Sequence, residues 1–255
     1  MAIPIKSPRD IEAMRCAGRL LWRILDGARA RAVPAATTAQ IEAWVAGQMT
    51  AAGARPVMRD AGFPGAASIT INEEVAHAPP GPRRLRGGDI VTIDAALSLD
   101  GWCADAAVAV GVGAVSPQVR ALLAAALASV QAVVAAIRPG ERWSRVARSA
   151  AAAAGPRGCS IVAEYAGHGI GRALQETPPA PFWPDSGGQT PPAGQDFVLR
   201  PGMLLTVEPV LVLGRPQVLG LDDAWTVVTA DRSAAAHEER TVAVTGAGAL
   251  VLTAP

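Results

Sequence analysis

The order of helix and strand signals constrains the fold most strongly, because the same order occurs twice. Apolar residues recur at helical spacing over about 8–30 and 37–53, and alternating or β-branched residues fill 67–112. A second pair of helical patterns then covers about 116–138 and 143–154. Strand-like segments follow near 160–166, 203–213, 224–229 and 240–252. Two helices followed by strands, twice, predict two similar halves that share one sheet region, with helices on one face and a site on the other.

This repeat predicts a single α+β domain over residues 1–255, with pseudo-repeat halves of about 7–113 and 114–255. A chain of 255 residues with 50% hydrophobic residues can fill a substantial core. No linker separates independent domains. The Pro- and Gly-rich segment from Pro178 to Gly194 is expected to be a surface loop that rims a cleft.

Charge and cysteine usage limit the expected partners and compartment. Lys and Arg number 23 against 22 Asp and Glu, so no long-range field attracts nucleic acid or a membrane surface, and neither is expected as a partner. The apolar stretch Ala121 to Ile137 contains Ser129 and Gln131 and is expected to be a buried helix. Three cysteines without a CxxC spacing, and a polar start without an export signal, indicate the cytoplasm.

Two aspartates stand in predicted strands that a short turn joins. Asp100 and Gly101 are a two-residue hairpin signal. With the flanking residues paired, Asp94 lies opposite Ala107, and Asp105 becomes its diagonal neighbour on the same face, about 7 Å away. Such carboxylates repel one another, whereas one or two divalent ions would keep both ionised. The alternative is that one caps a turn and the other is solvated.

Three more candidates come from the C-terminal half. His168 stands in GHGIG (167–171), where glycines permit unusual dihedrals and let the backbone approach a ligand; a structural histidine in a glycine turn is the alternative. Glu208 lies inside the apolar MLLTVEPVLVL, where an unpaired carboxylate is costly. Glu239 precedes a strand and would otherwise be a solvated residue.

One imidazole and four carboxylates form a hard, oxygen-rich donor set. That set suits a pair of Mn, Fe, Co or Zn ions better than a structural zinc, which prefers thiolates. Two such ions are suited to hydrolysis, because they can activate water and polarise a carbonyl. A serine or cysteine nucleophile is not expected, since His77, His168 and His237 are the only histidines and no GxSxG motif occurs.

Several segments resemble the type I methionine aminopeptidases of the pita-bread metallopeptidase superfamily, over nearly the whole chain. The matching segments are SITINEEVAH (68–77), LRGGDIVTIDAALSLDGWCAD (85–105), YAGHGIGRALQE (165–176), LRPGMLLTVEP (199–209) and WTVVTADRSAAAHEERTVAVT (225–245). The resemblance implies a pita-bread fold, with two pseudo-symmetric halves of paired helices packed on a curved antiparallel sheet. It favours type I because there is no extra N-terminal domain and no large insertion between Asp105 and His168.

The resemblance also implies roles for the five ligands. Asp94 would chelate one ion, His168 and Glu208 would bind the other, and Asp105 and Glu239 would bridge the two. Glu208 is also expected to act as a proton shuttle for the attacking water.

Four further residues carry implied roles in the substrate site. His77 would contact the scissile amide nitrogen and assist the leaving amine, or else be a hydrogen-bonded loop histidine. Phe63 and Trp225 would line the methionine side-chain pocket, or else belong to the core. Gln175 stands where the family carries a second histidine that hydrogen-bonds the substrate carbonyl. An amide can donate that bond but cannot carry a proton.

The function expected from this resemblance is removal of the initiator methionine from nascent chains whose second residue is small. Peptide and nascent-protein N-termini are the expected partners, the ribosome is a candidate, and the protein is expected to be a monomer. Gln175 motivates one alternative, a weakened homologue that holds metal and peptide N-termini. Ser68 and Leu174, where larger or softer residues are usual, motivate another, an aminopeptidase of altered residue preference.

Overall fold

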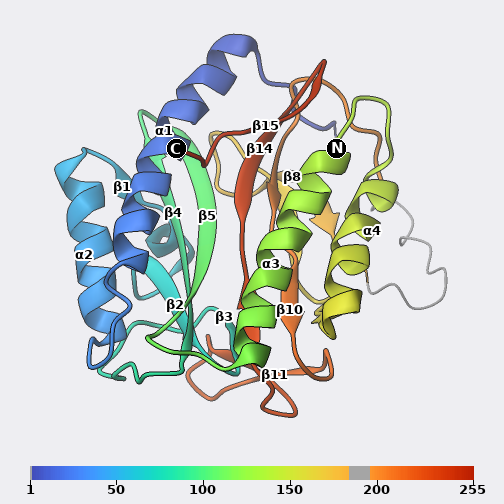
Figure 1. Ribbon diagram of the computed structural model, residues 1–255. Coiled ribbons are helices and arrows are strands. Elements are labelled where there is room, and N and C mark those ends of the chain that lie inside the picture. Colours follow the sequence, from blue (N-terminus) through green and yellow to red (C-terminus); the bar gives the residue numbers. More distant parts are fainter. Residues whose placement is uncertain (1, 184–195) are drawn as a thin grey trace.

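Four helices pack against the strands in the computed structural model, which describes residues 2–183 and 196–255 (Figure 1). The helices are α1 (Pro8–Arg29), α2 (Thr38–Ala51), α3 (Pro117–Ala136) and α4 (Trp143–Ala154). Helix α1 packs on β4 and β5 and α2 on β2, whereas α3 packs on α4, β5 and several later strands. The four helices predicted from the sequence are confirmed.

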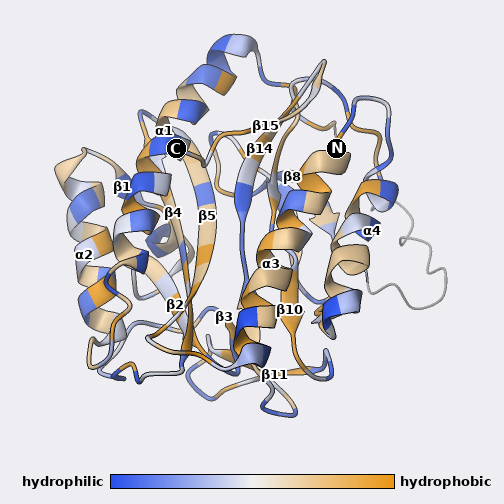
Figure 2. Ribbon diagram, in the orientation of Figure 1, coloured by the Kyte–Doolittle hydropathy of each residue, from blue (hydrophilic) through white to orange (hydrophobic). Residues whose placement is uncertain are grey.

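Local capping fixes where three of these helices begin. Ser7 and Asp10 form a capping box at α1, and Thr37 and Gln40 form another at α2. At α3 the hydroxyl of Ser116 accepts a hydrogen bond from the backbone of the first turn. Figure 2 shows the hydropathy of each residue along these elements, with apolar residues abundant on α3 and on the central strands.

The strands form antiparallel ladders in both halves of the sequence. The earlier strands are β1 (Arg55–Pro56), β2 (Ala67–Ile71), β3 (Glu74–Ala76), β4 (Ile90–Leu99) and β5 (Trp102–Gly111). The later strands are β6 (Ser160–Ile161), β7 (Ala166–Gly169), β8 (Glu176–Pro181), β9 (Leu204–Val207), β10 (Val210–Val212), β11 (Val218–Gly220), β12 (Val227–Thr229), β13 (Ala235–His237), β14 (Arg240–Thr245) and β15 (Gly248–Val251).

Two of the sheets carry most of the site. One contains β1-β4-β2 with β5 paired to β4, and the other has the order β15-β14-β9-β7-β8. Smaller sheets, β13-β10-β6 and β11-β12-β3, flank them. Helices α1 and α2 thus cover the first sheet, and α3 contacts both large sheets through β5, β9 and β15.

The β4–β5 hairpin has the predicted register. Asp100 and Gly101 have φ of 52° and 75°, as a two-residue turn with positive φ at both positions requires. Leu99 pairs with Trp102, which puts Asp94 opposite Ala107. Asp105 pairs with Ala96, so it is the diagonal neighbour of Asp94 on the same face of the hairpin.

Helix α3 has the length and apolar composition of a membrane-spanning helix, but a core helix passes the same test. About one third of its most apolar stretch is buried in this fold. Its buried residues are Leu122, Ala125, Ala126, Ser129, Val130 and Val133. This face packs against α4 and the sheets, as expected for the segment from Ala121 to Ile137.

Two expectations on the strands need correction. The apolar run over 203–213 is not one strand, because Glu208 and Pro209 separate β9 from β10, and proline cannot donate to a ladder. The expected loop from Pro178 to Gly194 begins inside β8, which continues to Pro181. Its residues from 184 onward lie outside the described part of the chain.

Candidate metal centre

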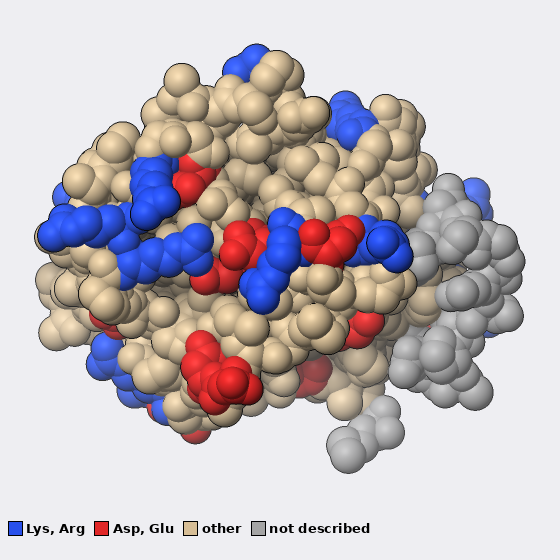
Figure 3. Space-filling view, turned by 90° about the horizontal axis from the view of Figure 1, so that it is seen from below, with Lys and Arg blue, Asp and Glu red and all other residues tan. Residues whose placement is uncertain are grey.

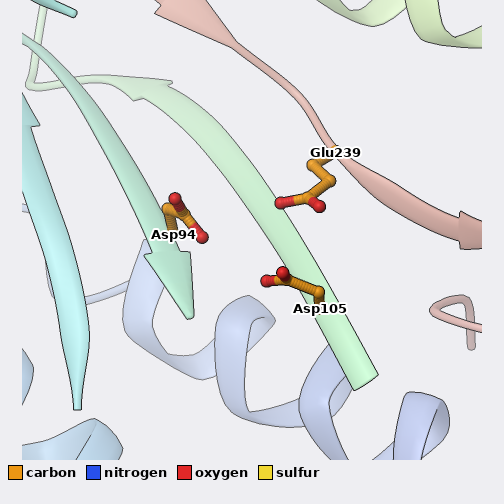
Figure 4. Close-up of side chains that lie close together, drawn as sticks. All are labelled: Asp94, Asp105 and Glu239. Carbon is orange, nitrogen blue, oxygen red and sulfur yellow. The ribbon is translucent and has the colours of Figure 1, made fainter. Parts of the chain in front are cut away.

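Three carboxylates, two from neighbouring strands and one from a link between strands, converge on one point (Figure 4). Asp94 comes from β4, Asp105 from β5, and Glu239 from the link between β13 and β14. One oxygen of each lies within 4.8 Å of the others. The backbone explains the meeting, because Ala107 lies opposite Asp94 on one side and exchanges hydrogen bonds of 3.1 and 3.4 Å with Glu239 on the other.

A second contact ties this cluster to the other large sheet. The Thr241 hydroxyl donates to the carbonyl of Asp105 at 2.7 Å and accepts from its backbone N–H at 3.1 Å. Thr241 lies in β14, which pairs with β9. The backbone of Asp105, which carries the carboxylate, is therefore held where the two sheets meet.

His168 and Glu208 approach the same cluster from the second sheet. His168 Nε2 lies 3.7 Å from Asp105 Oδ2 and 4.0 Å from Glu208 Oε1. His168 Nδ1 lies 2.9 Å from the carbonyl of Gly169, which only accepts, so Nδ1 carries the proton. The lone pair of Nε2 then faces the carboxylates, which is the form in which a histidine binds a metal.

Thr206 couples these two residues. Its hydroxyl accepts from the backbone N–H of His168 at 2.9 Å and donates to Glu208 Oε1 at 2.8 Å. One short side chain on β9 thus fixes the backbone that carries the imidazole and the carboxylate beside it.

The glycines around His168 serve close strand packing and not the turn expected from the sequence. His168 lies in β7, and neither Gly167 nor Gly169 has a positive φ. A Cβ at Gly167 would lie 2.3 Å from the carbonyl oxygen of Thr206, and one at Gly169 would lie 2.3 Å from that of Thr177. Larger residues would therefore push β7 away from its neighbours.

Burial and mutual repulsion disfavour charge on all four carboxylates. Burial raises the pKa of Asp94 to about 7 and that of Glu208 to about 8. Burial also raises the pKa of Asp105, and the charges of Asp94 and Glu208 raise it further. The same causes raise the pKa of Glu239, whose Oε1 is buried with no hydrogen-bond partner among the described residues.

These observations fit a divalent metal centre. Four carboxylates, two of them buried and two largely buried, lack enough donors beside one imidazole to stay ionised, and divalent cations would satisfy the unpartnered oxygen and cancel the repulsion. Carboxylate oxygens with an imidazole suit Mn, Fe, Co or Zn. Two divalent ions would balance the charge of four carboxylates.

Two of the predicted substrate residues form an aromatic pair, and a third lies beside a tyrosine. Phe63 is buried, and its ring meets Trp225 edge-on with centroids 5.3 Å apart. His77 has a φ of 56° and directly follows β3. Strand β3 pairs with β12, which begins two residues after Trp225. The ring of His77 lies 6.0 Å from that of Tyr165, and desolvation lowers the pKa of His77.

Gln175 is exposed, and no hydrogen bond ties it to the carboxylates among the described residues. It ends the bend 171–175, just before β8. The next residue, Glu176, holds this bend: its carboxylate accepts from the backbone N–H of Arg172 at 2.8 Å and binds Lys6 Nζ at 2.6 Å.

His237 was not assigned a role from the sequence, yet it lies beside the cluster. Its Nε2 is 3.9 Å from Asp94 Oδ2, and the residue is 4% exposed. Burial lowers the pKa of His237 to about 4, and nearby His77 adds to the shift, so the ring is neutral at pH 7. Its position two residues before Glu239 is a signal that could have found it, since alternate residues of a strand share a face.

Comparisons with known proteins identify the family of this chain. The profile of metallopeptidase family M24 matches residues 12–246. A methionine aminopeptidase from Treponema pallidum is 37% identical over 99% of this chain and 97% of its own length. Methionine aminopeptidase 1 from Mycobacterium tuberculosis is 38% identical over 98% and 95%, respectively.

The fold is similar as well. The crystal structure of methionine aminopeptidase from Rickettsia prowazekii superposes with a TM-score of 0.93 and 30% sequence identity, covering 99% of this chain and all of that one. This likeness confirms the expected pita-bread fold. The chain belongs to metallopeptidase family M24 and, within it, to the methionine aminopeptidases.

Proposed function

We propose that this protein is a metal-dependent aminopeptidase that removes the initiator methionine from peptides and nascent proteins whose second residue is small. One observation carries the proposal: the carboxylates of Asp94, Asp105 and Glu239 converge beside the imidazole of His168. The names of the relatives support the same activity.

We assign the metal ligands as expected from the sequence. Asp94 would chelate one ion, His168 and Glu208 would hold the other, and Asp105 and Glu239 would serve both. The central location of Asp105, between Asp94 and His168, supports its bridging role. When bound, the ions supply Lewis-acid activation of water and of the scissile carbonyl.

Glu208 is suited to move the proton in this reaction. Burial raises the pKa of Glu208 and favours its protonated form, whereas the ions it would hold favour the carboxylate, so it can both accept and release a proton. The hydroxyl of Thr206 donates to Glu208 Oε1 at 2.8 Å, which fixes the position of this carboxylate. Glu208 takes a proton from the attacking water and returns it to the departing amine.

His77 and Gln175 orient the scissile bond. His77 is neutral at pH 7 because desolvation lowers its pKa, so its ring can exchange a hydrogen bond with the scissile amide nitrogen. The Gln175 amide donates to the carbonyl oxygen, where negative charge develops. The edge-on pair of Phe63 and Trp225 offers an apolar, aromatic contact for a thioether side chain.

The proposal also covers the compartment, the oligomeric state and the partners of the enzyme. The described cysteines Cys16, Cys103 and Cys159 are free, which supports a reducing compartment, the cytoplasm. Acidic and basic side chains alternate across the middle of one face, with a group of basic ones to one side (Figure 3). We propose that the enzyme is a monomer that meets nascent chains near the ribosome without binding nucleic acid directly.

The central experiment measures hydrolysis of Met-Ala-Ser by metal-free protein reconstituted with Mn, Fe, Co or Zn. Free methionine should appear with at least one metal. Acetyl-Met-Ala-Ser, which lacks a free amine, is the matched substrate control and should not be cleaved. Failure of all four metals to restore cleavage would reject the proposed function.

A peptide panel then tests the residue preference. Peptides Xaa-Ala-Ser that vary the first residue should show methionine as the best substrate. Met-Xaa-Ser peptides should be cleaved well with Gly, Ala or Ser in second place and poorly with Leu. Preference for another first residue would support the altered specificity suggested by Ser68 and Leu174.

A further inference from the structure

His237 is a buried imidazole inside the site without an assigned role. It ends β13, where it pairs with Val210 of β10, so a neighbouring strand fixes its backbone. Only 5% of its side chain is exposed. Its Nδ1 is fully buried, and neither ring nitrogen has a hydrogen-bond partner among the described residues. Leaving a polar ring unpartnered in the interior is costly.

The strand pattern directs this ring toward the carboxylates. Glu238 and Arg240 face the other way, where they form an ion pair of 2.8 Å and Glu238 accepts from the backbone N–H of Ala109. His237 and Glu239 alternate with them and share the opposite face. Glu239 is a member of the carboxylate cluster, so His237 stands on the same face of the backbone as that cluster.

The distance to Asp94 fits a shared ion better than a hydrogen bond. His237 Nε2 lies 3.9 Å from Asp94 Oδ2, which is too long for an N–H···O bond. Metal bonds to imidazole nitrogen and carboxylate oxygen are each about 2.0–2.2 Å, so two ligands of one ion can lie up to roughly 4.2 Å apart. One cation beside Asp94 can therefore contact both atoms with little movement.

We propose that His237 is a second imidazole ligand of the metal centre, binding through Nε2 to the ion beside Asp94. This inference rests on the proposed metal site and adds a sixth protein ligand to it. The two imidazoles are not equivalent. The Nδ1–H of His168 is held by a carbonyl, whereas that of His237 has no described partner, so His237 should bind its ion more weakly.

A second nitrogen also changes the metal preference of the site. Imidazole suits Zn and Co, whereas carboxylates and water suit Mn. His237 should therefore favour Zn over Mn at the ion beside Asp94. Removing its nitrogen should weaken Zn binding more than Mn binding.

The chain has only three histidines, which makes a direct test possible. Nitrogen NMR of ¹⁵N-histidine-labelled protein, titrated with two equivalents of Zn, reports which ring nitrogens bind metal. Single His→Gln variants assign the three signals. We expect metal-bound Nε2 signals for His168 and His237 and none for His77.

The outcomes separate this inference from the proposed function. A metal-bound signal for His168 with an unchanged one for His237 overturns the inference and leaves the metal site in place. Unchanged signals for all three histidines would reject both.

An affinity measurement gives independent evidence. His237→Gln should weaken binding of one Zn equivalent at least about 10-fold, as judged by competition with a chelator, and should weaken Mn binding less. His77→Gln is the matched control and should change neither affinity by more than about twofold. Wild-type Zn affinity in a folded His237→Gln protein would contradict the inference.

Discussion

His168 Nε2 lies 3.7 Å from Asp105 Oδ2, and the two residues come from different sheets. Strand β5 brings the aspartate and β7 brings the histidine. Because neither sheet holds the full set of donors, the metal centre forms only when the sheets are packed together. A substitution at this junction should therefore be able to raise the stability of the metal-free protein while it lowers the affinity for metal.

Replacing Asp105 by asparagine should separate these two effects. The amide is nearly isosteric but removes a carboxyl group whose ionised form is disfavoured by burial and by the charges of Asp94 and Glu208. The metal-free protein should gain stability, with a rise of a few degrees in Tm, because 1 kcal/mol corresponds to roughly 2–4 °C at this size. Metal-induced stabilisation should disappear, and kcat/KM should fall by at least about 100-fold.

Melting curves with EDTA and with excess Co or Mn provide the measurement. Cys16→Ser is the control. Cys16 is exposed on α1, far in sequence from Asp105, so its replacement should leave both melting curves unchanged. A metal-free Asp105→Asn protein that melts several degrees below wild type would argue against charge repulsion at this site.

The pH dependence of the metal-free protein should follow from the raised carboxyl pKa values. Asp94 and Glu208 titrate near 7 and 8 when folded, well above their unfolded values. The unfolded state therefore binds fewer protons, and their contribution to stability is lost as the pH rises through 7 and 8. His237 has a lowered pKa, so it costs stability only below about pH 6.5.

We therefore expect the Tm in EDTA to fall between pH 6.5 and 9, and the stabilisation by added metal to grow over the same range. Thermal melts at several pH values, with and without Mn, test this pair of trends. A metal-free Tm that rises steadily up to pH 9 would contradict the buried, mutually repelling carboxylates.

Local signals in the sequence were sufficient for part of this architecture. The β4–β5 register follows from a two-residue turn at Asp100 and Gly101, and one turn fixes every pairing along a hairpin. The capping boxes at Ser7 and Thr37 likewise mark helix starts through contacts only three residues apart. These features depend on neighbours in sequence, so a pattern can reveal them.

Other features depend on contacts between distant segments. Glu239 meets Asp94 only because both flank Ala107, which is 132 residues away from Glu239. The glycines beside His168 predict a turn from the sequence. In the structure, Gly167 is required because the carbonyl of Thr206, on a later strand, leaves no room for a Cβ. The location of His237 in the site likewise depends on a distant neighbour, Asp94 on β4.

The Gln175 position tests how well an amide replaces the family histidine. If the amide donates to the substrate carbonyl, Gln175→Ala should lower kcat by about 100- to 1,000-fold. Gln175→His keeps a donor and should change kcat by less than about 10-fold. Steady-state kinetics on Met-Ala-Ser distinguish the cases, and a gain of about 100-fold in Gln175→His would favour the weakened homologue.

The ion pair between Lys6 and Glu176 should stabilise the bend that carries Gln175. Both side chains are largely buried, at 12% and 15% exposed, and Glu176 also accepts from the backbone of the bend. Lys6→Met should lower the free energy of unfolding by about 1–3 kcal/mol. Glu176→Ala should cost more, because it also leaves the N–H of Arg172 without its acceptor.

A double-mutant cycle with Lys6→Met and Glu176→Gln checks the pair. Denaturant unfolding should show the double variant to be less destabilised than the sum of the single variants. Strict additivity would mean that the two charges do not interact in solution.

Gly167 should be irreplaceable because of the strand beside it. A Cβ at this position would lie 2.3 Å from the carbonyl oxygen of Thr206, and backbone atoms cannot move aside cheaply. Gly167→Ala should therefore cost about 1–3 kcal/mol of stability or more. It should also shift His168 away from Thr206 and Glu208, so the affinity for metal should fall by at least about 10-fold.

Gly47→Ala is the matched control for this substitution. Gly47 lies on the exposed side of α2, and a Cβ there would have no neighbour within 4 Å. The same change should stabilise the protein by about 0.5–1 kcal/mol, because alanine favours a helix. Chemical denaturation and metal titration of both variants provide the comparison. Equal effects of the two substitutions would show that β7 and β9 tolerate separation, and that the close approach does not hold His168 in the site.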